Sequence, residues 1–380
     1  MIERVRKAIP AGIARKLWIK AGGRCEYENC NQVLWRDSLT QRDMNKAYIS
    51  HIIAARPKWK RGNKKLSKQK QIAFDNLMLL CDQCHNRIDK AQPDEHPVGR
   101  LRKMKKLHEE RIEFLTSIKL EKRTHVVMYG ARIGEHGVPL TTDEVFVALL
   151  PQRYPSNERP IELGMRNSSF EDRTDEFWRV EKKNLENLFQ QKMVPLKGND
   201  EVQHFSVFAL APQPLLIRLG TLLSDIYPAD VFQRHREPST WNWQNESETK
   251  EIRVDEPADK TGLPVLKLSL SATITDDRIV VVLGKECSIW TLSIDTPNND
   301  FLKTRALLSD FRRKSRLVFD RIKTAHGENA RIHIFPAMPV SAAVELGRVW
   351  MPKADLPLVI YDQNRMAGGF KKAINIDNSM

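Results

Sequence analysis

The 380-residue sequence has no long apolar run, and it has little cysteine. A membrane-spanning helix needs about 20 consecutive apolar residues, and no segment approaches that length. Residues 1–23 are basic and amphipathic but lack an apolar core and a cleavage site, so we expect an opening helix that ends at Gly22-Gly23 rather than a secretion signal. These absences exclude an integral membrane protein and indicate that no membrane partner is needed.

Only five cysteines are present, and four of them form two close pairs, Cys25-x4-Cys30 and Cys81-x2-Cys84. Four such thiolates can close a tetrahedral structural zinc site, with two ligands from each end of the segment. The metal would staple ~50 intervening residues whose own apolar content is sparse. So few cysteines, arranged for zinc, predict a reducing, cytoplasmic compartment. The fifth, Cys287, lies in an apolar run and is expected to be an inert core residue.

Three polar residues lie inside or beside this zinc-stapled segment: His51, Asn76 and His85. The runs 47–54 and 77–80 read as strands, and residues 84–90 would open a helix. A lone histidine on an apolar strand is usually a satisfied core residue, and a four-cysteine cluster alone is usually structural. A structural zinc site does not explain three such residues in this order, and an imidazole titrates near neutral pH and can take a proton from water.

The order Cys-x4-Cys, His, Asn, Cys-x2-Cys-His resembles the zinc-containing, McrA-like type of HNH endonuclease, which has a ββα-metal core. The resemblance implies that His51 is the general base and that His85 ligates a catalytic Mg²⁺ or Mn²⁺. It also implies that Asn76 orients His51 or assists the metal.

Many HNH enzymes have an acidic residue directly before the first histidine, where this chain has Ser50. Ser50 or a main-chain carbonyl would then serve the catalytic cation, or Asp43 or Asp75 would reach into the metal shell.

The positive charge is confined to the first third of the chain. Residues 1–123 hold 29 Lys and Arg against 14 Asp and Glu, whereas the remainder holds 33 against 34. The first part therefore meets a polyanion, which the rest does not need to do. Residues 56–70 carry eight cations and no acid, and we interpret them as a loop that contacts the phosphates of double-stranded DNA. The residues predicted to bind DNA are Arg56, Lys58, Lys60, Arg61, Lys64, Lys65, Lys68 and Lys70.

Apolar residues recur at helical spacing between residues 97 and 123, so we predict a long connecting helix there. This gives three parts: a nuclease domain at 1–96, a connecting helix at 97–123, and a second domain at 124–380. In the second domain, residues 145–150, 267–271, 279–283 and 288–294 read as strands.

An internal repeat organises the second domain. Residues 206–220 align without gaps on residues 333–347, and each copy follows an amphipathic helix (174–193 and 300–325). Each copy also runs on to another apolar strand, at 230–232 and 358–361. This order is typical of parallel strands with helical crossovers, so we predict two fused Rossmann-like units and an α+β / α/β fold for the whole chain.

A duplicated Rossmann-like domain binds its ligand where the turns after the strands meet helix N-termini. The turns here are Pro212-Gln213 and residues 339–341, and neither contains GxGxxG or a P-loop, so a dinucleotide redox cofactor or ATP is not expected. Trp241 and Trp243 lie in a nearby polar loop and could be core residues or a stacking surface for bases.

The phrases at 204–220, 233–243 and 332–350 resemble the SAVED domain, a fusion of two CARF-like units that binds cyclic oligonucleotides. Together with the HNH motif, nearly the whole chain resembles the HNH–SAVED effectors of bacterial CBASS anti-phage systems. The resemblance implies a cyclic dinucleotide, made by a CD-NTase, that drives homo-oligomerisation to a dimer or tetramer and activates DNA cleavage with little sequence preference. The expected ligand contacts are Pro212, Gln213, Gln233, His235, Trp241, Trp243, Pro336, Pro339, Ser341 and Tyr361.

Two alternatives stay open at this point. One is a restriction-like HNH nuclease whose second domain reads modified DNA, although a DNA reader should be basic and this domain is near neutral. The other is a ligand-gated, zinc-stapled DNA-binding regulator without catalysis.

Overall fold

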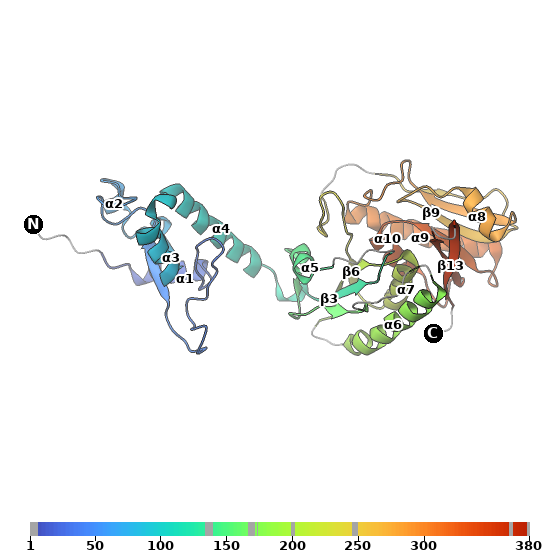
Figure 1. The fold of residues 1–380 in the computed structure, drawn as a ribbon, viewed down its shortest axis with the longest axis horizontal. Helices are drawn as coiled ribbons and strands as arrows, with labels where there is room; N and C mark the ends of the chain where they lie inside the picture. The colour runs from blue at the N-terminus through green and yellow to red at the C-terminus, as the bar shows by residue number, and fades with distance from the viewer. Residues whose placement is uncertain are drawn as a thin grey trace, which may run out of the picture. The chain divides into compact units, whose positions relative to one another are not determined.

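The computed structural model describes residues 7–133, 140–165, 172, 174–198, 202–244, 250–364 and 368–377. The chain forms two compact units, Met1–Lys119 and Leu120–Met380 (Figure 1). Within the described residues, no helix combines the length and the apolar character that crossing a membrane would need.

The first unit is built on one small antiparallel pair of strands. The strand β1 (Ala47–His51) pairs with β2 (Leu77–Cys81), so that His51 lies opposite Leu77 and Ala47 opposite Cys81. The helix α3 (Asp82–Asn86) follows β2 directly and continues as one π-helical turn, η2 (Arg87–Ala91). The predicted order of strand, strand and helix is therefore present. The remaining elements are α1 (Ala11–Lys20), α2 (Leu66–Gln69), η1 (Phe74–Asn76), η3 (Pro93–Glu95) and α4 (Val98–Thr116).

The helix predicted as a connector packs on the first unit. Leu101 and Met104 of α4 are buried in the same core as β2 and the cysteines, and Nε2 of His108 donates a hydrogen bond at 2.9 Å to the carbonyl oxygen of Ala21. The structure thus places one boundary after Lys119, where the sequence suggested boundaries after 96 and 123. Helix α1 ends as expected, because Gly22 follows it at φ +60°.

The second unit contains two sheets with the same internal strand order. In the first sheet, β3 (Arg123–Gly130) lies between β5 (Ile161–Glu162) and β6 (Phe205–Leu210), and β7 (Ala229–Val231) pairs with β6. All these pairings are parallel, and β4 (Tyr154–Pro155) pairs with the start of β3. Helix α5 (Thr142–Leu149) covers one face, and α6 (Asp175–Lys192) and α7 (Gln213–Leu223) cover the other.

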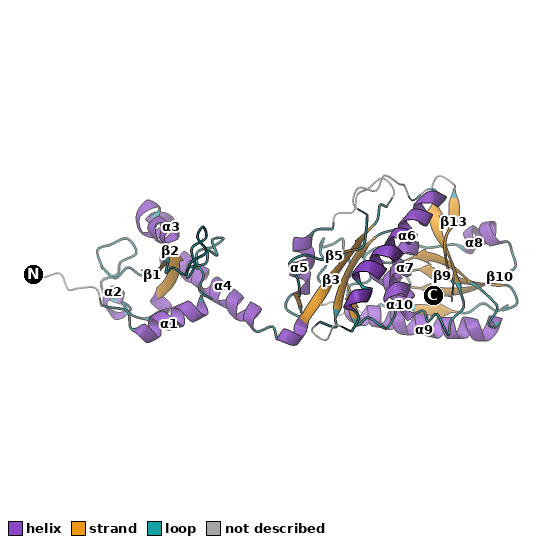
Figure 2. Cartoon of the chain, turned by 90° about the horizontal axis from the view of Figure 1, so that it is seen from below, coloured by secondary structure: helices purple, strands orange, loops and turns teal. Residues whose placement is uncertain are grey.

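The second sheet repeats this plan. The strand β9 (Leu263–Ser269) lies between β10 (Cys287–Ser293) and β11 (Ile332–Ala337), and β12 (Leu358–Asn364) pairs with β11, all in parallel. Helix α8 (Asp276–Leu283) covers one face, while α9 (Arg305–His326) and α10 (Val340–Val349) cover the other (Figure 2). Antiparallel strands β8 (Arg253–Asp255) and β13 (Gly369–Ile376) extend its edges. The short turns η4 (Leu120–Lys122) and η5 (Val194–Leu196) complete the unit.

The two halves meet through the helices of the sequence repeat, α7 and α10. A Cβ on Gly220 would lie 2.0 Å from the carbonyl oxygen of Val344, and a Cβ on Gly347 would lie 2.0 Å from that of Ile217. Gly220 aligns with Gly347 in the repeat, and Ile217 aligns with Val344. The contact is therefore reciprocal, as a pseudo-two-fold axis between the helices requires. This geometry confirms the predicted pair of Rossmann-like units.

Two predicted strands are helices. Residues 145–150 lie almost entirely in α5, and residues 279–283 belong to α8. Both are short apolar runs, which periodicity alone cannot assign to strand or helix. Both helices follow a threonine and begin with acidic residues, Asp143-Glu144 and Asp276-Asp277, and this N-terminal signal outweighs the apolar run.

Candidate functional site

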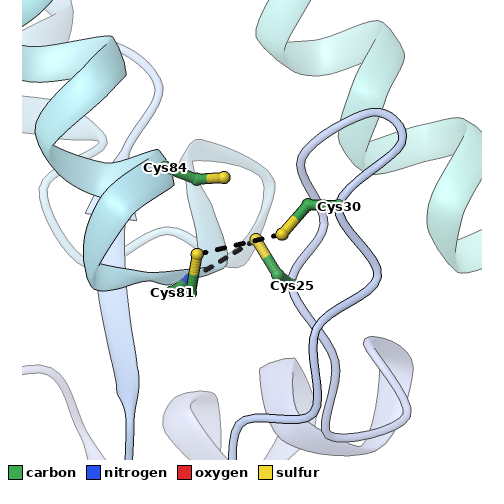
Figure 3. Close-up of side chains that lie close together, drawn as sticks. All are labelled: Cys25, Cys30, Cys81 and Cys84. Carbon is green, nitrogen blue, oxygen red and sulfur yellow. Dashed lines mark hydrogen bonds between the residues drawn. The ribbon is translucent and has the colours of Figure 1, made fainter.

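The four paired cysteines converge in the first unit, as the sequence predicts (Figure 3). Cys25 and Cys30 come from the loop after α1, while Cys81 ends β2 and Cys84 lies in α3. Their four sulfur atoms lie within 4.8 Å of one another, and Sγ of Cys30 is 3.9 Å from Sγ of Cys81. In a zinc–tetrathiolate tetrahedron with bonds of about 2.3 Å, neighbouring sulfurs are about 3.8 Å apart.

The surroundings of these sulfurs also fit a cation. Burial raises the pKa of Cys25 to about 12, and burial together with the neighbouring thiols raises the pKa of Cys84. At Cys30, burial is outweighed by hydrogen bonds from the main chain of Gln32 and from the neighbouring thiols, which lower its pKa. The main-chain N–H of Cys81 donates to Sγ of Cys25 at 3.4 Å, which favours a thiolate there. The donor set and spacing therefore fit one structural zinc ion.

His51 ends β1 and is buried, with 7% of its surface exposed. Its Nε2 lies 2.8 Å from the carbonyl oxygen of Gln71. A carbonyl can only accept, so in the neutral ring Nε2 carries the proton and Nδ1 is the basic nitrogen. This tautomer is the one that a general base acting through Nδ1 requires.

Asn76 is fully buried directly before β2 and binds main chain on both sides of the site. Its Oδ1 accepts from the N–H of Ile53 at 2.7 Å, and its Nδ2 donates to the carbonyls of Ile53 at 3.0 Å and Lys70 at 3.1 Å. These bonds fix the chain that leaves His51 and the chain that precedes Gln71. Asn76 therefore holds the backbone around His51 rather than the imidazole itself.

His85 lies in α3 against the outer face of β1. Its ring stacks on Tyr48, with centroids 4.9 Å apart and planes tilted by 16°. Its Nε2 is 3.2 Å from Oδ2 of Asp89, one turn further along the helix. Burial alone would raise the pKa of Asp89, but its bonds to His85 and Arg61 outweigh burial and lower it, so Asp89 stays a carboxylate.

Ser50 lies on the same face of β1 as Tyr48, since alternate residues of a strand share a face. Its hydroxyl is buried and has no hydrogen-bond partner among the described residues, so its oxygen can bind an ion or a water molecule. Mg²⁺ uses few protein ligands and completes its shell with phosphate and water. Ser50 and His85 carry donor atoms of the kind that the sequence predicts for such a cation, and the carboxylate of Asp89 contacts the ring of His85. Of the two acids considered from the sequence, Asp75 is paired with Lys70.

The basic loop at 56–70 is only partly free. Lys60 pairs with Asp94 at 2.6 Å, Lys70 with Asp75, and Arg61 with Asp89. Arg61 was predicted to bind phosphate, but its side chain is 5% exposed and its guanidinium is occupied. This prediction is wrong for Arg61, because an inward-turned guanidinium with three acceptors cannot also reach DNA.

The other predicted DNA contacts point to solvent. Lys58, Lys64, Lys65 and Lys68 are exposed, and within the described residues none of them has a carboxylate partner. Arg56 is exposed as well and lies over the ring of Trp59 at 5.0 Å, and Trp59 itself is 57% exposed. Arg61 links their loop to the neighbours of His51 and His85, through the carbonyl of Ile52 and the carboxylate of Asp89.

In the second unit, the two turns of the repeat come together. Oε1 of Gln213 accepts from the N–H of Met338 at 3.2 Å, directly before Pro339. Oε1 of Gln233 accepts from both the N–H (3.1 Å) and the hydroxyl (2.8 Å) of Ser341. The N-termini of α7 and α10 are thus linked, as the pseudo-two-fold arrangement predicts.

Several other predicted ligand contacts are buried core residues. Trp241 is 1% exposed and packs edge-on against Phe208, so it is no open stacking surface in this structure. Tyr361 stacks on Phe335 at 4.4 Å on the α8 side of the second sheet. Sequence periodicity in so short a loop cannot separate an exposed tryptophan from a buried one. Of the remaining candidates, Pro212 and Pro336 are buried, and Trp243 is half-buried.

His235 is also buried, with 1% exposure, and lies edge-on to Trp243. Burial lowers its pKa to about 4, although Asp300, 3.8 Å away, acts in the opposite direction. Neither ring nitrogen has a hydrogen-bond partner among the described residues. Such a neutral, buried imidazole is sensitive to acid.

The sequence reasoning missed Tyr48 and Asp89. The spacing of His85 and Asp89, four residues apart, was available as a signal, because side chains at i and i+4 meet on a helix.

Comparison with known proteins identifies the second unit. The family model for SAVED, the SMODS-associated and fused to various effectors sensor domain, matches residues 185–376. No characterised relative of the chain was found in a search of curated sequences.

Solved structures similar to the chain include Cap4 SAVED/CARF-domain containing receptors. One from Acinetobacter baumannii, with the cyclic trinucleotide 2′3′3′-cAAA, is 12% identical over 74% of this chain and 61% of that chain, with a TM-score of 0.44. A second structure of that receptor is 10% identical, over 82% and 65% of the two chains, with a TM-score of 0.42. The Moraxella osloensis receptor is 9% identical, over 82% and 70%, with a TM-score of 0.37. The chain spans less than two thirds of the first of these receptors.

Proposed function

Because the chain belongs to the SAVED family of sensor domains, we propose that it is a ligand-activated endonuclease of anti-phage defence. In this proposal the second unit binds a cyclic oligonucleotide and the first unit cleaves double-stranded DNA. The observation that carries the nuclease part is that His51, Asn76 and His85 come from β1, η1 and α3 of one small unit with a four-cysteine cluster. Arg61 links two of them, because it binds the carbonyl of Ile52, next to His51, and Asp89, the partner of His85.

The residues act on a phosphodiester in the following way. Nδ1 of His51 takes a proton from a water molecule, whose oxygen bonds to phosphorus while the bond to the leaving deoxyribose oxygen breaks. A proton from solvent then neutralises the leaving oxygen. His85 and Ser50 would hold a divalent cation, which would stabilise the negative charge on the phosphate. Asn76 keeps the chain around His51 rigid, and the loop lysines hold the flanking phosphates.

The sensor part rests on the paired turns of α7 and α10. Two helix N-termini meet across the pseudo-two-fold axis, and the positive end of a helix dipole favours a phosphate. A cyclic dinucleotide has two phosphates related by the same kind of symmetry. We therefore favour a cyclic dinucleotide, from a CD-NTase, as the activator. Cyclic trinucleotides, one of which is bound in a similar solved receptor, are a second class to test.

The charge of the second unit speaks against the restriction-like alternative. Helix α9 is rich in arginine, yet its cations are paired: Arg305 with Asp230, Arg312 with Glu345, and Arg316 with Asp355. A surface neutralised in this way lacks the free positive charge that a DNA reader uses.

The nuclease is tested with His51→Ala in the full-length protein, with Mg²⁺, plasmid DNA and a panel of cyclic nucleotides. We expect cleavage to fall roughly 100- to 10,000-fold, the usual contribution of a general base. DNA affinity and zinc content should match those of the unmodified protein. Cleavage at the normal rate by this variant would show that the active site lies elsewhere, and an absence of cleavage by the unmodified protein under every condition would favour the regulator.

A further inference from the structure

A chain of polar contacts joins Arg61, Asp89 and His85. The proposed cleavage step uses neither the carboxylate of Asp89 nor the guanidinium of Arg61. One oxygen of Asp89 contacts Nε2 of His85 at 3.2 Å, and the other pairs with the guanidinium of Arg61. That guanidinium also donates to the carbonyls of Ile52 at 3.1 Å and Ile88 at 2.6 Å. A planar fork with three fixed acceptors holds the carboxylate in one orientation.

The orientation of Asp89 decides which nitrogen of His85 is basic. A neutral imidazole beside a carboxylate donates its proton to that carboxylate, so Nε2 carries the hydrogen and Nδ1 carries the lone pair. The stacked ring of Tyr48 fixes the plane of the imidazole. Metal-binding histidines generally donate their other N–H to a carboxylate or carbonyl, which raises their basicity and fixes the tautomer.

We propose that Asp89 and Arg61 are positioning residues that present Nδ1 of His85 to the catalytic divalent cation. The inference rests on the nuclease function proposed above. Arg61 also binds the carbonyl of Ile52, the residue after His51, so the same guanidinium ties the strand of the general base to the helix of the metal ligand. The basic loop, the base and the metal ligand are thereby held as one unit.

The primary measurement is Mn²⁺ binding to the full-length, DNA-free protein, followed by electron paramagnetic resonance. The variants are Asp89→Ala and Asp89→Asn, with His85→Ala as the baseline for the loss of the site. Asp94→Asn is the matched control, because Asp94 forms an exposed ion pair with Lys60 of the same loop. We expect Mn²⁺ binding about 10- to 100-fold weaker for Asp89→Ala, a smaller loss for Asp89→Asn, and no change for Asp94→Asn.

Cleavage gives an independent readout. The Mn²⁺ concentration for half-maximal cleavage should rise by the same factor as the dissociation constant, while the rate at saturating Mn²⁺ largely recovers. Arg61→Lys, which keeps the charge but loses the fork, should show a shift in the same direction. Because Asp89→Ala leaves a buried guanidinium without its carboxylate, zinc content and thermal unfolding are checked first, and Asp89→Asn decides the outcome if Asp89→Ala is unfolded.

Unchanged Mn²⁺ affinity in folded Asp89 variants would overturn the positioning role. Equally, if Asp89→Asn lost Mn²⁺ as completely as His85→Ala, Asp89 would be a direct ligand and the proposed role would be wrong. These outcomes are separate from a failure of the nuclease function, which would appear as absent cleavage and absent Mn²⁺ binding in the unmodified protein.

Discussion

The two units solve the problem of stability in opposite ways. The first unit has a small core around β2 and α4 and contains four sulfur atoms that lie close enough to share a metal. The second unit has a large continuous core that links both sheets through α7 and α10. A small core leaves more of the folding free energy to a bound metal, whereas a large core supplies it through buried apolar surface.

The use of positive charge follows the same division. The first unit keeps exposed lysines such as Lys58 and Lys64 without carboxylate partners among the described residues. The second unit pairs the arginines of α9 with acids. Unpaired surface cations are costly only in mutual repulsion and are ready to meet phosphates. Net charge alone therefore does not show how differently these cations of the two units are paired.

The loss of one cysteine sulfur should have the largest effect, because it should unfold the first unit and leave the second unit folded. Cys81→Ser should abolish zinc binding and unfold the first unit, because the binding energy of structural zinc, about 10–16 kcal/mol in small domains, is largely folding energy. Cys287→Ser, outside the cluster, is the control and should change neither property. Metal analysis and limited proteolysis measure the effect, with the second unit expected to stay resistant. A zinc-free first unit that resists protease would contradict the account.

The contact between α7 and α10 is the counterpart in the second unit. Gly220→Ala and Gly347→Ala should each destabilise that unit by about 3 kcal/mol, because an added Cβ overlaps main-chain oxygen. Gly99→Ala in α4 is the control, since nothing lies within 4 Å of its Cβ position, and it should be neutral or slightly stabilising. Urea unfolding of the full chain tests this. Clearly unequal losses for the two repeat glycines would break the symmetry argument.

Acid should weaken the second unit through His235. Its pKa is about 4 in the folded protein against 6.5 in an open chain, so the unfolded state binds a proton first as the pH falls. The stabilisation is fully present above pH 6.5 and is lost as the pH falls from 6.5 to 4. At pH 5 the free energy of unfolding is lower by about 2 kcal/mol. His235→Phe should flatten this dependence. Urea titrations at pH 7.5 and 5.0 give the free energy of unfolding, and pulsed hydrogen exchange at one fixed pH reports on β6. An equal loss of stability between the two pH values in the variant and in the unmodified protein would refute the prediction.

The smallest effect concerns single cations of the basic loop. Lys64→Gln should reduce the slope of log affinity for DNA against log salt by about 0.9, the value of one lost phosphate contact. Lys60→Gln should reduce it less, because Lys60 is already paired with Asp94. Fluorescence anisotropy at several salt concentrations measures both slopes. Equal slopes for the two variants would mean that the ion pairs in the loop do not matter.

Some features could be predicted from residues alone because the chemistry is local to the sequence. The spacing of Cys25, Cys30, Cys81 and Cys84 suffices to predict their convergence, and the aligned Gly220 and Gly347 predict the paired halves. Other features depend on long-range packing. The inward turn of Arg61 needs the carboxylate of Asp89, which the fold brings from η2, and the burial of Trp241 needs Phe208 of β6. Neither partner is near in sequence, so composition gave the opposite expectation for Arg61.

The central claim is that the second unit controls the first, and light scattering combined with plasmid cleavage tests it most directly. The full-length protein with Mg²⁺ is titrated with cyclic dinucleotides and cyclic trinucleotides, and mass and cleavage rate are recorded on the same samples. A ligand can shift the assembly only through its greater affinity for the assembled state. The account predicts an inactive, smaller species without ligand and a larger, active species with one of these nucleotides. Full cleavage without any nucleotide, at unchanged mass, would contradict it.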